Sequence, residues 1–335
     1  MNLADEKILV TGVTGFIGGR LALRLVSEKR AVVRGLARDP AKARSLAETG
    51  IEIVQGDMRD AASLRRAVEG CSVVIHAAAQ VSSVPDRQTF VDSNVAGTEN
   101  ILRASEAAGV RRFVHLSSVA VFGLAAQGNV TDQAARAHSG DPYCDTKVDS
   151  EELVFRYHRE GRVPATVLRP SSVYGPGSTH WTIIPLKRIK KGRMLLFDGG
   201  RGRLNYVYID NLVDAILLAA EDERALGEAF IVNDGASTWR EYFDAYARMA
   251  GKKKVPSIPL WAARFWVRYR NLRAVLRHEP YRIHPNGLGF LVSKAIFDQT
   301  HIERTLGHRS RVTLEEGLRR TESWCREVGL LNAEL

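Results

Sequence analysis

A tyrosine and a lysine stand four residues apart in "DPYCDTK", at Tyr143 and Lys147, directly after Pro142. If this stretch is helical, the two side chains share a face, because residues four apart are neighbours on a helix. A tyrosine ionises at about pH 10, and a nearby ammonium group favours the phenolate and lowers that pKa. Such a pair can pass a proton to or from an alcohol or ketone oxygen. The spacing alone is common on ordinary amphipathic helices, so other parts of the chain must support this interpretation.

Two serines offer hydroxyl groups for the same chemistry. Ser117 and Ser118 lie in "HLSSVAVFG", at the carboxyl end of a strand predicted over 112–118. Doubly wound sheets bind ligands at the carboxyl ends of their strands, so a hydroxyl there could bind and orient a substrate oxygen.

A glycine pattern near the N-terminus predicts a dinucleotide site. "TGVTGFIG" has glycines at Gly12, Gly15 and Gly18, and it follows a predicted strand (7–12) and opens a predicted helix (16–29). Glycine permits the tight turn, the approach of backbone to a pyrophosphate and the close packing of helix on strand. The amide groups and positive end of the helix then favour phosphate. Together with this loop, the serine–tyrosine–lysine order favours catalysis over a plain helix.

The end of the second predicted strand indicates which dinucleotide is bound. A carboxylate there would bind the adenosine ribose, whereas an arginine suits a 2′-phosphate. "VVRGLARDP" places Arg38 at this point, so NADP(H) is favoured and NAD(H) is the alternative. Asp39 would be the ribose acceptor if the register is shifted by one residue, and Lys42 and Arg44 could add positive charge.

Two further strand ends could contact the cofactor. Asp57 ends the third predicted strand, where it could hold the adenine or act as a simple turn residue. "HAAA" ends the fourth, and the small side chains of Ala77, Ala78 and Ala79 leave room for a ligand or simply pack. His76 is expected to be a packed strand histidine.

Strands and helices alternate along the first half of the chain, which indicates βαβ units and a parallel sheet. The predicted fold is α/β, a doubly wound Rossmann-type parallel sheet with a smaller, mainly helical C-terminal substrate domain. We expect residues 1–175 to form the dinucleotide-binding domain, with 206–234 returning to it. "YVYI" and "AFIVND" would then be strands of the same sheet. Residues 176–205 and 235–335 would form the substrate domain, with everything from Ser237 helical or irregular.

Composition narrows the class of protein. The 335 residues are 45% hydrophobic and 26% charged, with no signal-like start and no apolar run long enough for a membrane span, which favours a cytoplasmic protein. Three widely spaced cysteines argue for reduced thiols and no metal site. Eight of the ten net positive charges fall between 251 and 285, where nine Lys or Arg face one acid. No nucleic-acid-reading module accompanies them, so no nucleic-acid partner is expected.

The motifs together closely resemble the extended short-chain dehydrogenase/reductase family, also described as NAD(P)-dependent epimerases and dehydratases. The matching stretches occur in family order over about residues 7 to 235: "TGVTGFIG", "GDMRD", "HAAA", "NVAGTEN", "LSSVAVFG", "YCDTK", "LRPSSVYGPG" and "YVYIDNLVDAI". The resemblance implies that Tyr143 donates or accepts the proton, that Lys147 lowers its pKa and binds the nicotinamide ribose, and that Ser118 binds the substrate oxygen. Asn94 matches the family's helix asparagine near the active site. Phe122 stands where many members have tyrosine, which we interpret as a packing change.

The resemblance also implies contacts beyond this catalytic set. The implied cofactor contacts, besides Tyr143 and Lys147, are Gly12, Thr14, Gly15, Phe16, Ile17, Gly18, Arg38, Asp57, Met58, Ala77, Ala78, Ala79, Pro170 and Val173. Candidate substrate contacts, besides Ser118, are Val81, His180 and Trp181. Family members pair through two helices, one carrying the tyrosine, so a homodimer is expected.

The C-terminal part is most similar to the 3β-hydroxysteroid or sterol dehydrogenase-like branch, so we expect alcohol/ketone chemistry on a hydrophobic small molecule. The alternatives are a nucleotide-sugar epimerase and a non-catalytic dinucleotide-binding regulator. "SVAVFG" lacks the acidic pair expected of a dehydratase. In 258–280, aromatic residues interleave with arginines, a pattern of a core helix with a basic face or of an interfacial helix in peripheral contact with a membrane. The arginines could instead grip a sugar-nucleotide pyrophosphate.

Overall fold

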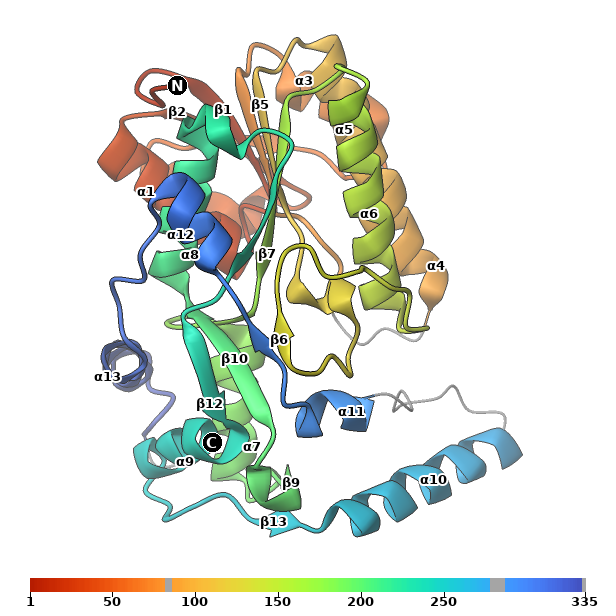
Figure 1. Cartoon of the computed structure of the whole chain (residues 1–335). Coiled ribbons are helices and arrows are strands. Elements are labelled where there is room, and N and C mark those ends of the chain that lie inside the picture. Colours follow the sequence, from red (N-terminus) through yellow and green to blue (C-terminus); the bar gives the residue numbers. More distant parts are fainter. Residues whose placement is uncertain (82–85, 278–286, 333–335) are drawn as a thin grey trace.

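A computed structural model describes residues 1–81, 86–277 and 287–332. Within this part of the chain, seven strands form one parallel sheet in the order β11-β7-β5-β4-β1-β2-β3 (Figure 1). Their bounds are β1 (Lys7–Thr11), β2 (Val32–Ala37), β3 (Glu52–Gln55), β4 (Val73–His76), β5 (Arg112–Leu116), β7 (Ala165–Pro170) and β11 (Ala229–Val232). The strand order reverses between β1 and β4, and ligands of doubly wound sheets bind outside the carboxyl ends at such a point. The predicted Rossmann-type fold is confirmed.

Helices cover both faces of this sheet (Figure 1). Ile8 and Val10 of β1 pack in one cluster with Leu21, whereas Leu9 packs in another with Leu64, because successive strand side chains point to opposite faces. The first face carries α1 (Phe16–Lys29) and α8 (Ile209–Glu221), and the second carries α3 (Ala61–Val68), α5 (Gly97–Ala107) and α6 (Pro142–Arg159).

The helical stretch between β4 and β5 has three segments. It begins as α4 (Arg87–Phe90), continues as a π-helical stretch, η2 (Val91–Ala96), and ends as α5. A π-helical insertion shifts the residues after it around the helix axis, and such insertions are frequent at functional sites. The buried Asn94 lies in η2.

One strand expected in the large sheet belongs to another. "AFIV" joins the large sheet as predicted, beside β7. The first three residues of "YVYI" instead belong to β10 (Arg203–Tyr208), which pairs with β8 (Ser172–Tyr174) and β12 (Gly235–Thr238), and Ile209 opens α8. The stretch "ATVLRPSSVY" forms two successive strands, β7 and β8, which belong to different sheets. Pro170, which lacks an N–H donor, ends β7 just before this change. The division into domains stays a prediction.

The C-terminal part is mainly helical and also holds short strands that the sequence did not suggest. Its helices are α9 (Trp239–Met249), α10 (Leu260–Leu276), α11 (Gly287–Val292), α12 (Thr300–Leu306) and α13 (Leu314–Glu327). β13 (Ser257–Ile258) pairs with β9 (Leu196–Phe197), and β14 (Ile296–Phe297) pairs with β6 (Asn129–Val130). The remaining helices are α2 (Arg44–Ala47) and α7 (Ile184–Lys190). None of the helices in the described residues is both long and apolar enough to cross a bilayer.

Candidate active site

The glycine turn between β1 and α1 forms a cradle that side chains would fill. Gly12 has a φ of 70°, and a Cβ on it would lie 2.9 Å from the backbone of Ala78. A Cβ on Gly18 would lie 2.3 Å from the carbonyl oxygen of Gly12, so this glycine lets α1 pack against the turn. Gly15, the N-cap residue of α1, provides no side-chain hydrogen bond. The first amide groups of α1 therefore lack a side-chain cap, an arrangement that suits a pyrophosphate.

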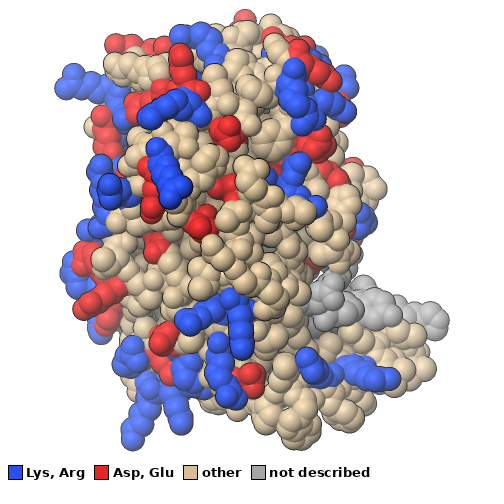
Figure 2. Space-filling view, in the orientation of Figure 1, with Lys and Arg blue, Asp and Glu red and all other residues tan. Residues whose placement is uncertain are grey.

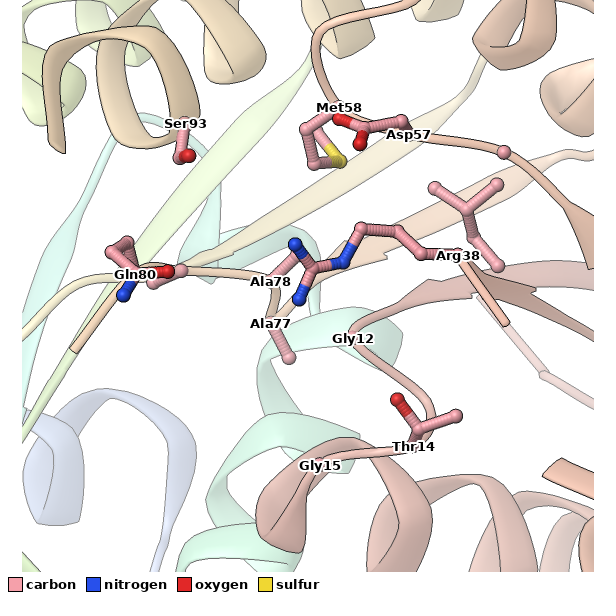
Figure 3. A pocket seen from close by; sticks show the side chains of 13 residues that line it. Gly12, Thr14, Gly15, Arg38, Asp57, Met58, Ala77, Ala78, Gln80 and Ser93 are labelled. Atoms are coloured by element: carbon pink, nitrogen blue, oxygen red, sulfur yellow. The ribbon is translucent and has the colours of Figure 1, made fainter. Parts of the chain in front are cut away.

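A pocket of about 240 Å³ lies beside this turn (Figure 3). Nine predicted cofactor residues line it: Gly12, Thr14, Gly15, Arg38, Asp57, Met58, Ala77, Ala78 and Ala79. They come from the ends of β1, β2, β3 and β4, strands far apart in sequence whose carboxyl ends meet at one edge of the sheet. The structure thus brings together the predicted phosphate loop and the predicted ribose and adenine residues.

Arg38 is the cationic side chain of this pocket. It extends across the pocket between Asp57 and the loop at Ala77 and Ala78 (Figure 3). Asp39, the alternative ribose acceptor, instead accepts a hydrogen bond from the backbone of Ala41 at 3.1 Å and caps a short 3₁₀ turn. Asp39 is therefore engaged as a cap, whereas Arg38 lines the pocket; which of them contacts a cofactor ribose stays a prediction.

Asp57 forms an ion pair with a neighbouring arginine. Its Oδ2 lies 2.9 Å from Nη2 of Arg59, and this interaction lowers the pKa of the carboxyl group. Among the described residues that line the pocket, Asp57 is the one carboxylate. Its charge is partly balanced by Arg59, so the pocket offers little repulsion to a phosphate.

Four lining residues were missed by the sequence interpretation: Leu36, Gly56, Gln80 and Ser93. Gly56 directly precedes Asp57 and Leu36 lies two residues before Arg38, so a wider window at the strand ends would have included them. Gln80 and Ser93 lie on the side of the pocket away from Arg38 (Figure 3). Ser93 directly precedes Asn94 in η2, so its position next to a predicted site residue could have identified it.

The proton-transfer residues converge at the start of α6. Asp141 caps this helix by accepting hydrogen bonds from the amides of Tyr143 and Cys144, both at 3.0 Å. The side chain of Ser118 lies close enough to the phenol of Tyr143 to oppose the rise in its pKa. The hydroxyl of Ser118 also accepts from the amide of Ala120 at 3.1 Å, which orients it after β5. Ser118 and Tyr143 thus lie near one another, and their joint action on a substrate oxygen stays a prediction.

Burial controls the pKa of both partners in this pair. Desolvation raises the pKa of Tyr143 to about 12, although the hydrogen bond from Ser118 opposes this. Desolvation also lowers the pKa of Lys147 to about 8. The expected lowering of the tyrosine pKa by Lys147 is therefore wrong in this structure, because burial is the largest influence on the phenol and raises its pKa. Tyr143 is a neutral phenol at neutral pH.

Asn94 connects the pocket to the helix that carries Tyr143. Its Oδ1 accepts a hydrogen bond from the amide of Gln80 at 2.7 Å, and its Nδ2 donates to the Gln80 carbonyl at 3.1 Å. The same amide group donates to the hydroxyl of Thr146 at 3.2 Å. Asn94 thus holds the loop after β4 and the first turn of α6 in a fixed relation.

His76 is a packed strand histidine, as expected. Its Nδ1 lies 2.8 Å from the hydroxyl of Thr11, and its Nε2 lies 3.1 Å from that of Thr98. Burial lowers its pKa to about 3, so the ring is neutral. The Thr11 hydroxyl also accepts from the amide of Ala78 at 3.1 Å, so this network supports the pocket floor.

Several other predicted residues lie outside the pocket lining. Gly18 and Pro170 are buried, and Phe16, Ile17 and Val173 are partly buried against the core beneath the site. Among the substrate candidates, Val81 and His180 are exposed. Trp181 packs against Trp239 and Phe290, with ring centroids 6.0 and 6.4 Å apart. Their contact with cofactor or substrate stays a prediction.

The doubly wound sheet, the glycine turn and the Ser118–Tyr143–Lys147 set define a class of dinucleotide-dependent α/β enzymes. Comparison with known proteins specifies the family. The model of the NAD dependent epimerase/dehydratase family matches residues 8–233, and the chain belongs to this family. It is an NAD(P)-binding oxidoreductase of the extended short-chain type, as its motifs predicted.

Three relatives illustrate the range of this family. A 4-hydroxy-2-methyl-3-oxo-4-farnesyl-3,4-dihydroquinoline-1-oxide ketoreductase of Stigmatella aurantiaca is 30% identical over 93% of this chain and 94% of that protein. A 3 beta-hydroxysteroid dehydrogenase/Delta 5-->4-isomerase of Mycobacterium tuberculosis is 33% identical over 68% of this chain, and the match spans 65% of that protein. The solved structure of a dTDP-glucose 4,6-dehydratase from Streptomyces venezuelae, with NAD bound, is 25% identical with a TM-score of 0.79, over 97% of this chain and 99% of that one.

Proposed function

We propose that this chain is an NADP(H)-dependent oxidoreductase that interconverts an alcohol and a ketone on a hydrophobic, sterol- or lipid-like small molecule. The observation that carries the proposal is the closeness of the Ser118 and Tyr143 side chains after β5, the strand that pairs with β4 and so neighbours the pocket residues Ala77 and Ala78. Two hydroxyls at one point can both bind a single carbonyl oxygen, and the tyrosine can then protonate it.

The residues present fit a dinucleotide phosphate. The first amides of α1 and the backbone of Gly12 would hold the pyrophosphate, and the Arg38 guanidinium would pair with the 2′-phosphate. The bound nicotinamide would supply or take up the hydride. A chain with aspartate in place of Arg38 would favour the ribose hydroxyls of NAD(H).

The protonation state of Tyr143 suits ketone reduction. With a pKa of about 12, the phenol keeps its proton and can donate it to the carbonyl oxygen as the carbonyl carbon receives the hydride. Ser118 would hold that oxygen through its own hydroxyl, and the buried ammonium of Lys147 would stabilise the phenolate that remains. For alcohol oxidation the same proton would travel the other way.

A hydrophobic substrate is supported by the relatives and by the aromatic side chains of the C-terminal part. The names of two relatives contain a farnesylated quinoline oxide and a hydroxysteroid, and both a farnesyl chain and a steroid skeleton are hydrocarbon. In this chain the half-buried Trp181 lies against Trp239 and Phe290, an apolar surface without a charged group in the stack.

Epimerisation of a nucleotide sugar is the second candidate, because the matched family model includes epimerases. The two functions differ in the fate of the cofactor. Nicotinamide absorbance should therefore be followed with NADPH and with NADH, each offered hydroxysteroid ketones, lipid ketones and nucleotide sugars. Stoichiometric oxidation of NADPH by a hydrophobic ketone supports the proposal. A sugar nucleotide that changes configuration without net cofactor oxidation would replace it with an epimerase.

A non-catalytic regulator is the third candidate function. Such a protein would bind the dinucleotide but would convert none of these compounds.

The expected homodimer, formed through two helices of which one is α6, stays a prediction that sedimentation can test.

A further inference from the structure

Helix α10 (Leu260–Leu276) exposes an unusual amount of apolar surface. Seven large apolar side chains on it are exposed. Two of them are Trp266 and Val275, and the other five are Trp261 (73%), Phe265 (71%), Tyr269 (54%), Leu272 (59%) and Leu276 (72%). Exposed apolar groups of this size that gather in one place mark an interaction surface rather than a random exposure. In Figure 1 the helix extends from the side of the C-terminal part, away from the large sheet.

These five residues form a continuous stripe. Their spacing of four, four, three and four residues keeps them within an arc of about 80° on a helix of 3.6 residues per turn. The small side chains Ala263, Val267 and Ala274 are buried and lie on the opposite side of the helix. The stripe therefore faces outward along the length of α10 while the small residues face the protein.

Arginines line both edges of the stripe. By the same helical spacing, Arg264 and Arg268 flank it on one side, and Arg273 and Arg277 flank it on the other. All four are exposed. From Gly251 to Arg277 the sequence has eight Lys or Arg and no Asp or Glu. The projecting region at the lower right of Figure 2 likewise shows Lys and Arg without Asp or Glu.

We propose that α10 docks on an anionic lipid bilayer, with the stripe in the boundary between head groups and acyl chains. Tryptophan is favoured at this depth, and arginine can bury its aliphatic stem while its guanidinium reaches the phosphates. Anionic lipid attracts each added cation, so the two rows of arginine strengthen the binding. The predicted contact segment, 258–280, thus coincides with this helix, and its last three residues lie outside the described residues.

The arginines along the stripe favour a bilayer over a second copy of the chain as the partner that covers α10. Two copies of α10 packed stripe to stripe would bring eight arginines of the two edges together without an acid from either helix. Like charges at such an interface repel, whereas an anionic lipid surface supplies the opposite charge continuously.

The test is flotation of the whole chain with vesicles of phosphatidylcholine, with and without phosphatidylglycerol. We expect binding that requires phosphatidylglycerol and weakens with salt. Replacing Arg264, Arg268 and Arg273 with Gln should weaken binding roughly a hundredfold, at about fivefold for each arginine. The matched control replaces Arg311, Arg319 and Arg326, which are also exposed, with Gln and should bind as the wild type does.

Fluorescence with brominated acyl chains locates the contact. We expect quenching of the wild type and loss of most quenching in a Trp261→Phe, Trp266→Phe variant that still floats, because phenylalanine keeps the apolar contact but not the fluorophore. No vesicle binding, or equal binding to both vesicles, would overturn the proposal. Self-association of the wild type that is lost in a Trp261→Ser, Phe265→Ser variant, without vesicle binding, would assign the stripe to a second copy. Each outcome is independent of which substrate the enzyme reduces.

Discussion

The ammonium group of Lys147 donates a hydrogen bond to the backbone carbonyl of Leu116 at a distance of 2.8 Å. Leu116 is the last residue of β5, two positions before Ser118, so this contact holds the catalytic helix against the edge of the sheet where the serine lies. The lysine is buried, and its desolvation outweighs the opposing influence of the Glu151 carboxylate. This environment explains why its pKa is lowered.

Ketone reduction should slow as pH rises through about 8, the pKa of Lys147. Below this value the ammonium stabilises the phenolate that forms on Tyr143, and above it the positive charge is lost. The measurement is kcat/KM against pH for the wild type and for a Lys147→Arg variant, which stays charged. The variant should keep its rate through this range, and an identical decline in both would contradict the assignment. Because the unfolded lysine titrates at about 10.5, the free energy of unfolding should also rise between these two pKa values.

Replacing Tyr143 with Phe removes the proton donor and leaves the ring. We expect kcat to fall by about 10²- to 10⁴-fold, because a general acid contributes this much. Binding of NADPH, followed by fluorescence, should change little. Tyr269→Phe, on the exposed face of α10, is the control and should keep full activity. Unchanged activity in Tyr143→Phe would favour the regulator or an unrelated proton donor.

Arg38→Ala should weaken NADPH binding and spare NADH. A charge-assisted hydrogen bond contributes about 1.5–3 kcal/mol, so the Kd for NADPH should rise roughly 10- to 100-fold. Calorimetry with both cofactors measures this, with Arg66→Ala, an exposed arginine of α3, as the control. If the Kd values for NADPH and NADH rise by the same factor, Arg38 contacts a part that the two cofactors share. Arg38 would then not determine a preference for NADP(H).

The buried ion pair of Glu151 and Arg169 should be a stability determinant of the catalytic helix. Its closest atoms are 2.8 Å apart and both side chains are almost completely buried. Glu151→Ala would leave an arginine buried without its partner, at a cost of about 3–5 kcal/mol in the free energy of unfolding. The neighbouring Glu152 is half exposed, so Glu152→Ala should change this quantity by at most about 1 kcal/mol. Urea denaturation of the two variants distinguishes a buried from a surface pair.

The features that the sequence predicted best are those that depend on a short local pattern of residues. The glycine turn, the strand ends at Arg38 and Asp57 and the small residues at Ala77–Ala79 all line the pocket, because carboxyl ends of parallel strands meet at one edge. The capped start of α6 was also predictable, since Asp141 and Pro142 form a strong helix-start signal.

Features that depend on contacts between residues far apart in the chain could not be predicted from the sequence. "YVYI" reads as a strand, but its pairing with β8 rather than with the large sheet depends on residues far along the chain. The raised pKa of Tyr143 follows from burial by several elements, which no spacing reveals. Gln80 enters the pocket because Asn94, fourteen residues later, holds its backbone on both sides.

Deuterium transfer tests the central claim most directly. NADPH with deuterium on the transferred position would be incubated with the chain and a hydrophobic ketone, and the product alcohol examined by mass spectrometry. The account predicts one deuterium on the new carbinol carbon, one oxidised cofactor for each product molecule and almost no product with Tyr143→Phe. A deuterium that stays on the cofactor, while a nucleotide sugar changes configuration in the same enzyme, would contradict net reduction and make the chain an epimerase.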